Sequence, residues 1–244
     1  GLPEATINDL AIDAKDKCTI YVASGNRLYR TEDCTRTWTD IYFDNNPGIQ
    51  ISAVAVDHYN NKNVYIGTSR GDIIKSSDRG QTWKAIQRLD DGVRKIVVSP
   101  TDSRVIFTAS AKNGIYRFNA DSFVNLDDLE NYKNRFDGTN WTDLNGELKE
   151  FNLGINFKNL VVCPDDNSLF LATDKVLLKS LDNGRSWIKI KLITPEKDTL
   201  INDIAVNPKD SDEFYYVSDT AFFKTADGGN TWTNQTSGLS GVTA

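Results

Sequence analysis

The chain has 244 residues, of which 39% are hydrophobic and 10% aromatic, and this composition supports a sizeable core and argues against a disordered chain. The formal net charge is −6, so the sequence offers no broad basic surface for a nucleic-acid backbone. No apolar run approaches the roughly 18 residues that a membrane-spanning helix requires.

The chain contains no Met and starts at Gly1 without a basic and apolar leader. Because a secretory leader is removed from the mature protein, we expect a processed product that was exported. The expected location is secreted, periplasmic or at the cell surface.

Strand patterns recur along the chain in a fixed order. Alternating apolar segments lie at 7–12, 51–56, 93–98, 157–162 and 201–206, and second strands follow at 19–23, 64–67 and 214–217. Between them stand turns rich in Asn, Asp, Gly and Pro. Only 127–132 is expected to form a helical turn. The order predicts four strands per repeat.

A motif ending in Trp closes each repeat. It reads Ser/Thr-x-Asp-x-Gly-x-Thr/Ser-Trp at 76–83, 180–187 and 225–232, and at 31–38 Thr35 replaces its Gly. A shortened copy at 137–141 lacks the leading hydroxyl. We call this motif the box, and its Asp and Trp residues are Asp33, Trp38, Asp78, Trp83, Trp141, Asp182, Trp187, Asp227 and Trp232.

The repeat length predicts an all-β propeller of four-stranded antiparallel blades. The Trp residues are spaced by 45, 58, 46 and 45 residues, which matches one blade per repeat with extra residues in the third. We expect one propeller domain over 1–244, with blades at about 1–48, 49–91, 92–154, 155–199 and 200–244. An insertion at about 118–136 belongs to blade three.

The boxes resemble those of the Asp-box, or bacterial neuraminidase (BNR), repeat superfamily over essentially the whole chain. Their phrasing is most similar to the sortilin-like, photosystem II assembly factor-like and xyloglucanase-type propellers. A sialidase is not expected, because its Arg-Ile-Pro stretch is absent from the sequence. Propellers of this superfamily often have six or seven blades, so the resemblance implies further blades or subunits that complete the ring.

The box residues are expected to be structural. An Asp two residues before Gly suits a tight turn, because the carboxylate accepts backbone N–H groups and Gly adopts positive φ. The Trp is expected to open the fourth strand and cover the edge of the blade. A carboxylate pair for acid–base catalysis would need convergent side chains, whereas a propeller distributes its boxes around the outer rim.

Two of the three cysteines are close in the predicted blade one. Pairing the second and third strands across Ser24–Asn26 places Cys18 opposite Glu32, two residues from Cys34. A Cys18–Cys34 disulfide is therefore geometrically reasonable and would suit an oxidising compartment. The alternative is two free thiols in a cytosolic protein. Cys163 has no partner and is expected to be an inert thiol.

Charged residues at the starts of the innermost strands are the first candidate binding site. Innermost strands line the channel of a propeller, and these positions carry opposite charges in different blades. A mixed-charge channel mouth would bind a polar ligand; the alternative is solvated strand starts whose charges balance. The candidates are Asn8, Asp9, Arg94, Lys95, Lys158, Asn202 and Asp203.

The insertion of blade three is the second candidate. It mixes acidic residues with the aromatic residues Phe123, Tyr132 and Phe136. Long loops on a rigid scaffold often carry binding, and aromatic faces suit sugars or peptide side chains. The alternative is a cap on the edge of the blade. The acidic residues lack the spacing of a calcium loop, so no metal or cofactor is expected.

The sequence as a whole favours a non-enzymatic binding or scaffold module for a protein or glycan partner. His58 is the only His and lies in the turn after the first strand of blade two, so no Ser-His-Asp triad, Cys-His pair or His-rich metal site is expected. The remaining enzymatic hypothesis is a fragment of a glycoside hydrolase that uses Asp9 and Asp203 as paired carboxylates.

Overall fold

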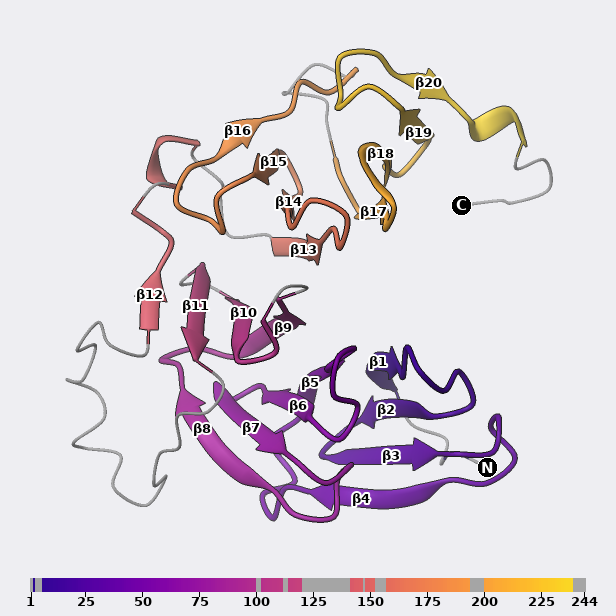
Figure 1. Cartoon of the computed structure of the whole chain (residues 1–244), viewed down its shortest axis with the longest axis vertical. Coiled ribbons are helices and arrows are strands. Elements are labelled where there is room, and N and C mark those ends of the chain that lie inside the picture. Colours follow the sequence, from indigo (N-terminus) through magenta and orange to yellow (C-terminus); the bar gives the residue numbers. More distant parts are fainter. Residues whose placement is uncertain are drawn as a thin grey trace. The chain divides into compact units, whose positions relative to one another are not determined.

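Five antiparallel sheets of four strands each make up the described part of the chain (Figure 1). The computed structural model describes residues 2, 6–99, 102–111, 114–119, 141–146, 148–151, 157–193 and 200–238. The predicted all-β architecture of four-stranded blades is thereby confirmed. The chain divides into two compact units, Gly1–Asp143 with three blades and Leu144–Ala244 with two, which we call unit one and unit two.

Each blade is an up-and-down sheet whose strands follow in chain order, from the inner strand to the outer one. Blade one has β1 (Ile7–Ile12), β2 (Ile20–Ser24), β3 (Arg27–Thr31) and β4 (Thr39–Phe43). Blade two has β5 (Ile51–Val56), β6 (Val64–Thr68), β7 (Asp72–Ser76) and β8 (Lys84–Arg88). Blade three has β9 (Val93–Val98), β10 (Val105–Ser110), β11 (Ile115–Asn119) and β12 (Trp141–Asp143).

Unit two repeats the same plan. Blade four has β13 (Phe157–Val162), β14 (Leu169–Thr173), β15 (Leu177–Ser180) and β16 (Ile188–Lys189). Blade five has β17 (Asp203–Asn207), β18 (Asp210–Val217), β19 (Phe222–Thr225) and β20 (Thr233–Asn234). Within the described ranges, helical structure is limited to the short 3₁₀ turns η2 (Lys149–Phe151) and η3 (Thr236–Gly238). The helical turn predicted at 127–132 lies outside the described residues.

Two local predictions were wrong by one residue. Ser24 pairs with Arg27, so a two-residue turn joins β2 and β3 where a three-residue turn was predicted. Extending this register places Cys18 opposite Asp33 and not opposite Glu32. The box Trp precedes the fourth strand in four blades and begins it only in blade three. Both errors concern turn length, which the alternation of side chains does not fix.

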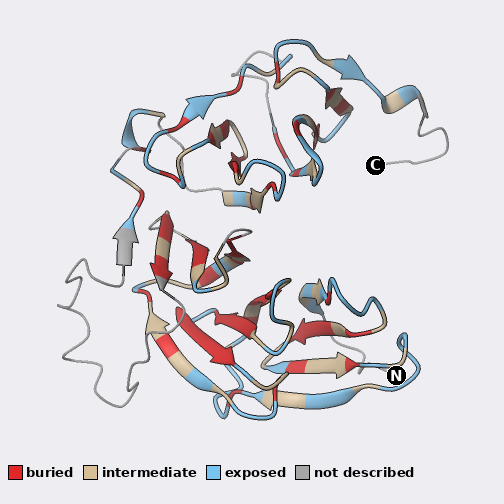
Figure 2. Cartoon of the chain, viewed as in Figure 1, coloured by how far each residue is buried: buried red, intermediate tan, exposed pale blue. Residues whose placement is uncertain are grey.

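The cores lie between successive blades. The described residues of β6, β7 and β14 are buried throughout, whereas the outer strands β16 and β20 are exposed (Figure 2). In unit one, the aromatic ring of Tyr21 and the side chain of Leu28 in blade one pack with Val54 and Ile66 of blade two. A strand buried on both faces gains from a run of mostly apolar residues, and this explains the sequences of β6 and β14.

Candidate functional site

The four intact boxes share one hydrogen-bonding pattern. In box two the hydroxyl of Ser76 donates to Asp78 Oδ1 at 2.8 Å and accepts the N–H of Gly80 at 2.7 Å. Asp78 in turn accepts the N–H of Thr82 at 2.8 Å and its hydroxyl at 2.6 Å. The same bonds recur in the boxes of Asp33, Asp182 and Asp227.

These bonds stabilise the ionised carboxylates. The hydroxyl of Thr82 and then its backbone N–H lower the pKa of Asp78 to about 2. The corresponding donors lower the pKa of Asp33 and that of Asp182 to about 2, and they also lower the pKa of Asp227. A carboxyl with so low a pKa is a poor general acid at neutral pH, so the box favours turn formation over proton transfer.

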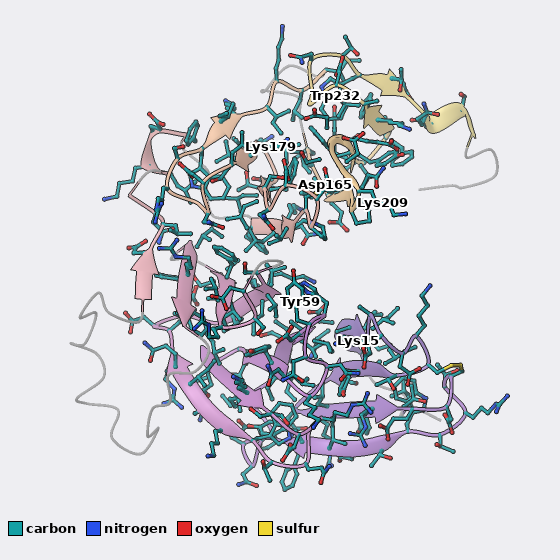
Figure 3. The ribbon with its side chains drawn as sticks, in the orientation of Figure 1. Lys15, Tyr59, Asp165, Lys179, Lys209 and Trp232 are labelled. Atoms are coloured by element: carbon teal, nitrogen blue, oxygen red, sulfur yellow. A yellow bond between two sulfur atoms is a disulfide. The ribbon has the colours of Figure 1, made fainter. Side chains whose placement is uncertain are left out.

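The boxes of blades two and five also fit their blade against the one before it. A Cβ on Gly80, whose φ is +93°, would lie 2.6 Å from Ile41 Cδ1 of blade one. The indole of Trp83 meets the ring of Tyr42 edge-on at 5.3 Å and donates to the carbonyl of Ile41 at 3.0 Å. In unit two, Trp232 donates likewise to the carbonyl of Lys191 at 2.9 Å (Figure 3).

Blade one carries the disulfide. Cys18 lies before β2 and Cys34 in the box turn, and the structure joins them with a Cα–Cα distance of 4.1 Å. Cys163 is a free and buried cysteine, and burial raises the pKa of its thiol. A raised pKa keeps a thiol protonated and unreactive at neutral pH.

Several of the candidate residues at the starts of the inner strands lie in β-bulges. The bulges fall at the second residue of β1, β5, β9 and β13, which is Asn8, Ser52, Arg94 or Lys158. A bulge re-aims its side chain, and here two of them reach the next inner strand. Asn8 donates to the carbonyl of Ile51 at 2.9 Å and Ser52 to that of Val93 at 2.6 Å.

Unit one brings Asp9 and Lys95 together. Asp9 Oδ2 accepts the backbone N–H of Val54 in blade two at 3.0 Å, and Asp9 Oδ1 lies 3.4 Å from Lys95 Nζ in blade three. Both carboxylate oxygens of Asp9 are therefore already bonded, one to blade two and one to blade three. Arg94 is exposed beside this pair.

Unit two uses the same position in a similar way. Asn159, which aligns with Asp9, donates to Asp203 Oδ1 at 2.7 Å, and Asp203 Oδ1 also accepts the N–H of Ile204 at 2.8 Å. Asn202 donates to Asp219 Oδ1 at 2.7 Å, and Lys158 is exposed. Asp9 and Asp203 thus belong to different units, and each accepts hydrogen bonds from the neighbouring blade of its own unit.

Sequence reasoning missed a charged cluster between blades one and two. Asp72 is fully buried at the start of β7 and pairs with Arg88, and its Oδ2 lies 2.7 Å from Arg70 Nη2. Arg70 also lies 3.6 Å from the buried Asp44. Burial first, and then the carboxylates of Asp44 and Asp72, raise the pKa of Tyr42 to about 12. The only trace in the sequence is an acidic residue directly before Ile73 and Ile74 at the start of a strand.

A basic residue immediately before the box hydroxyl was also missed. Lys179 Nζ lies 5.3 Å from the ring centre of Phe170 and donates to Ser211 Oγ at 3.0 Å and Asp212 Oδ1 at 3.2 Å in blade five (Figure 3). In unit one, Arg30 donates across the corresponding joint to the carbonyl of Arg79. Arg30 and Lys179 therefore join blades, whereas Lys224 at the same position pairs with Glu213 within blade five.

The structure bears only in part on the predicted aromatic site, metal sites and membrane spans. The aromatic candidates Phe123, Tyr132 and Phe136 lie outside the described residues. Among the residues that are described, no group of three or more His, Cys, Asp or Glu side chains is placed to hold a metal ion. Over the same ranges, no helix is both long enough and apolar enough to cross a membrane.

Comparisons with known proteins show the fold. No protein-family model matches the sequence, and no curated protein matches it. The GH74 enzyme of Niastella koreensis is 18% identical with a TM-score of 0.68 over 94% of this chain. The GH74 xyloglucanase of Xanthomonas campestris is 15% identical with a TM-score of 0.68 over 93% of it.

The chain spans 38% of the length of each of these two GH74 chains. YCF48 bound to D1 peptide is 18% identical with a TM-score of 0.50, over 97% of this chain and 84% of that one. At these identities the likeness establishes a β-propeller fold and nothing finer.

Proposed function

We propose that this chain is a propeller of the Asp-box (BNR) repeat superfamily that acts without catalysis, as a binding or scaffold module for a protein or glycan partner. The observation that carries the proposal is the bonding of Asp9 and Asp203, the carboxylates on which hydrolysis would depend. Asp9 accepts the N–H of Val54 at 3.0 Å, and Asp203 accepts the side chain of Asn159 at 2.7 Å. A carboxylate that joins two blades is poorly placed to act on a substrate.

A protein partner has one further support. The neighbour YCF48 is bound to a peptide, so a propeller similar to this one offers a peptide-binding surface. Exposed cations at the starts of inner strands, Arg94 in unit one and Lys158 in unit two, are candidate contacts for such a partner, each within its own unit. The Cys18–Cys34 disulfide agrees with the proposed secreted, periplasmic or cell-surface location, because disulfides persist in oxidising compartments.

We also propose that blade one is covered by a further blade or subunit within a single propeller. Its inner-strand side chains Ile7, Leu10 and Ile12 are 52%, 51% and 53% exposed. The equivalent Ile51 and Val54 of blade two are 0% and 2% exposed, because blade one packs on them. Covering an apolar face of this kind is favourable by roughly 25 cal/mol per Å².

Binding is tested on peptide and glycan arrays, followed by titration of each hit. We expect Arg94→Ala and Lys158→Ala to weaken binding without changing the urea midpoint. Arg36→Ala removes an exposed cation from the box turn of blade one and serves as the matched control. Binding that is equally weakened by all three variants would contradict a site at the inner strands.

The GH74 neighbours favour one alternative, a fragment of a glycoside hydrolase that acts on polysaccharide. It is tested by incubating the chain with a panel of β-glucans, including xyloglucan, and measuring reducing ends. Turnover abolished by Asp9→Asn or Asp203→Asn, with the fold intact, would overturn the non-catalytic proposal. Asn retains an acceptor oxygen, so these variants separate chemistry from structure.

A further inference from the structure

The turn of the first box has an unusual backbone. In each of the four intact boxes, two consecutive residues adopt positive φ. The second of them is Gly80, Gly184 or Gly229 in three boxes, at +93°, +83° and +92°. In the first box the two residues are Cys34 at +57° and Thr35 at +73°. Both carry a Cβ and Thr is β-branched, so this conformation is intrinsically unfavourable for them.

The first box belongs to the first described blade, so among the described residues no preceding blade packs on its turn as one does on the glycines of the other boxes. A Cβ on Gly80 would meet Ile41 at 2.6 Å, and one on Gly229 would meet Ile190 at 2.5 Å, so these turns fit closely against the preceding blade. Thr35 is exposed. The hydrogen bonds of the box do not compensate for this loss, because they match those of the other boxes: the N–H of Thr35 donates to Thr31 Oγ1 at 3.0 Å.

The disulfide joins the chain at a point where other blades have a hydrogen bond alone. The N–H of Cys34 donates to the carbonyl of Cys18 at 3.3 Å. The equivalent bond in box two runs from Arg79 to Lys62 at 2.9 Å. Only the first blade reinforces this bond with a covalent link among the described residues, and it does so where glycine is missing.

We propose that the Cys18–Cys34 disulfide replaces glycine as the element that holds the first box turn, and that this turn is a thiol-sensitive element of blade one. Cys34 is exposed and therefore accessible to a dithiol reductant. A thiolate of the reductant attacks the Cys34 sulfur, the S–S bond breaks, and Cys18 leaves as a thiolate that takes up a proton. The second thiol of the reductant attacks the mixed disulfide, becomes oxidised and releases the Cys34 thiol.

Reduction removes the covalent link that holds Cys34 and Thr35 at their unfavourable φ values. The turn then opens locally, and the amide groups that it protects exchange with solvent. The box of blade two keeps its glycine and its packing against Ile41, so its amides stay protected. Local opening of one turn without global unfolding is the specific consequence.

The test is hydrogen–deuterium exchange on the full chain, oxidised and in the Cys18→Ser/Cys34→Ser variant. We expect the amides of Thr35 and Thr37 to exchange at least about tenfold faster in the variant. The amides of Gly80 and Thr82, which occupy the same positions in box two, should not change. Their protection also reports that the variant has folded.

A glycine variant separates this proposal from a general loss of stability. Adding Thr35→Gly to the double Ser variant should restore most of the lost protection, because Gly adopts positive φ without cost. In the oxidised protein Thr35→Gly should change the exchange little. Unchanged exchange at Thr35 and Thr37 in the double Ser variant would overturn the proposal. Failure of Thr35→Gly to restore protection would do so as well.

Discussion

The substitution Gly80→Ala tests whether the box is a joint between blades. Gly80 has φ of +93°, and an added Cβ would lie 2.6 Å from Ile41 Cδ1 and 3.3 Å from Trp83. The left-handed backbone costs a residue with a Cβ about 1–2 kcal/mol. Forcing a methyl group into a packed contact adds about 1–3 kcal/mol. We therefore expect Gly80→Ala to lower the free energy of unfolding by about 2–5 kcal/mol.

Gly25→Ala is the matched control. Gly25 also has positive φ, at +56°, but an added Cβ there would meet nothing within 4 Å. Gly25→Ala should therefore lower the free energy of unfolding by about 1–2 kcal/mol, through the left-handed backbone alone. Both variants are compared with the parent by urea unfolding followed through Trp fluorescence, and the difference between them measures the contact with Ile41.

A second variant at the contact isolates the packing term. In the Ile41→Ala background there is room for the methyl group of Gly80→Ala. There, Gly80→Ala should lower the free energy of unfolding only as much as Gly25→Ala does in the parent. Equal costs for Gly80→Ala and Gly25→Ala in the parent would refute the reasoning. A cost of Gly80→Ala that Ile41→Ala leaves unchanged would do so too.

Three further predictions follow from buried or bonded carboxylates. The pKa values of the box carboxyls Asp33, Asp78 and Asp182 are lowered from the usual 3.8 to about 2 in the folded chain, so their contribution to the free energy of unfolding is complete above about pH 4. The urea midpoint should therefore fall as the pH is lowered from 4 to 2. Replacing one of these residues by Asn should make the midpoint depend less on pH. A midpoint of the parent that does not change over this pH range would contradict the lowered pKa of the box carboxyls. Asp72→Ala leaves two arginines without their buried partner and should cost about 3–5 kcal/mol in urea unfolding, whereas a cost below 1 kcal/mol would mean that the pair is solvated. Asp9→Ala removes the acceptor of a backbone N–H in blade two and should cost about 1–3 kcal/mol, while Asp9→Asn, which keeps an acceptor, should cost clearly less in the same assay.

Sequence patterns predicted the repeat and the four-stranded sheets because both depend on local chemistry. Side chains alternate between the faces of a strand, and the box residues bond within one turn, so the alternation and the motif are visible along the chain. The strand register was harder to predict from the sequence. A two-residue turn and a three-residue turn differ by one pairing, and the residues Ser24–Asn26 fit either.

The joints between blades could not be predicted from the chain. Asp9 bonds to Val54, 45 residues away, and no pattern in the sequence says which neighbour an inner-strand carboxylate faces. For the same reason the sequence suggested a channel site at Asp9 and did not reveal the charged cluster around Asp72. Both depend on which faces of two sheets come together.

The sequence by itself determined that this protein is built from box-terminated blades, since spacing and alternation are properties of the chain. Tertiary structure decided what the box does. Its Asp holds the turn, as the motif predicts, but its Gly and Trp lie against the preceding blade, where Ile41 leaves no room for a Cβ on Gly80. Close packing between separate sheets is a property of their surfaces, and only the folded chain brings those surfaces into contact.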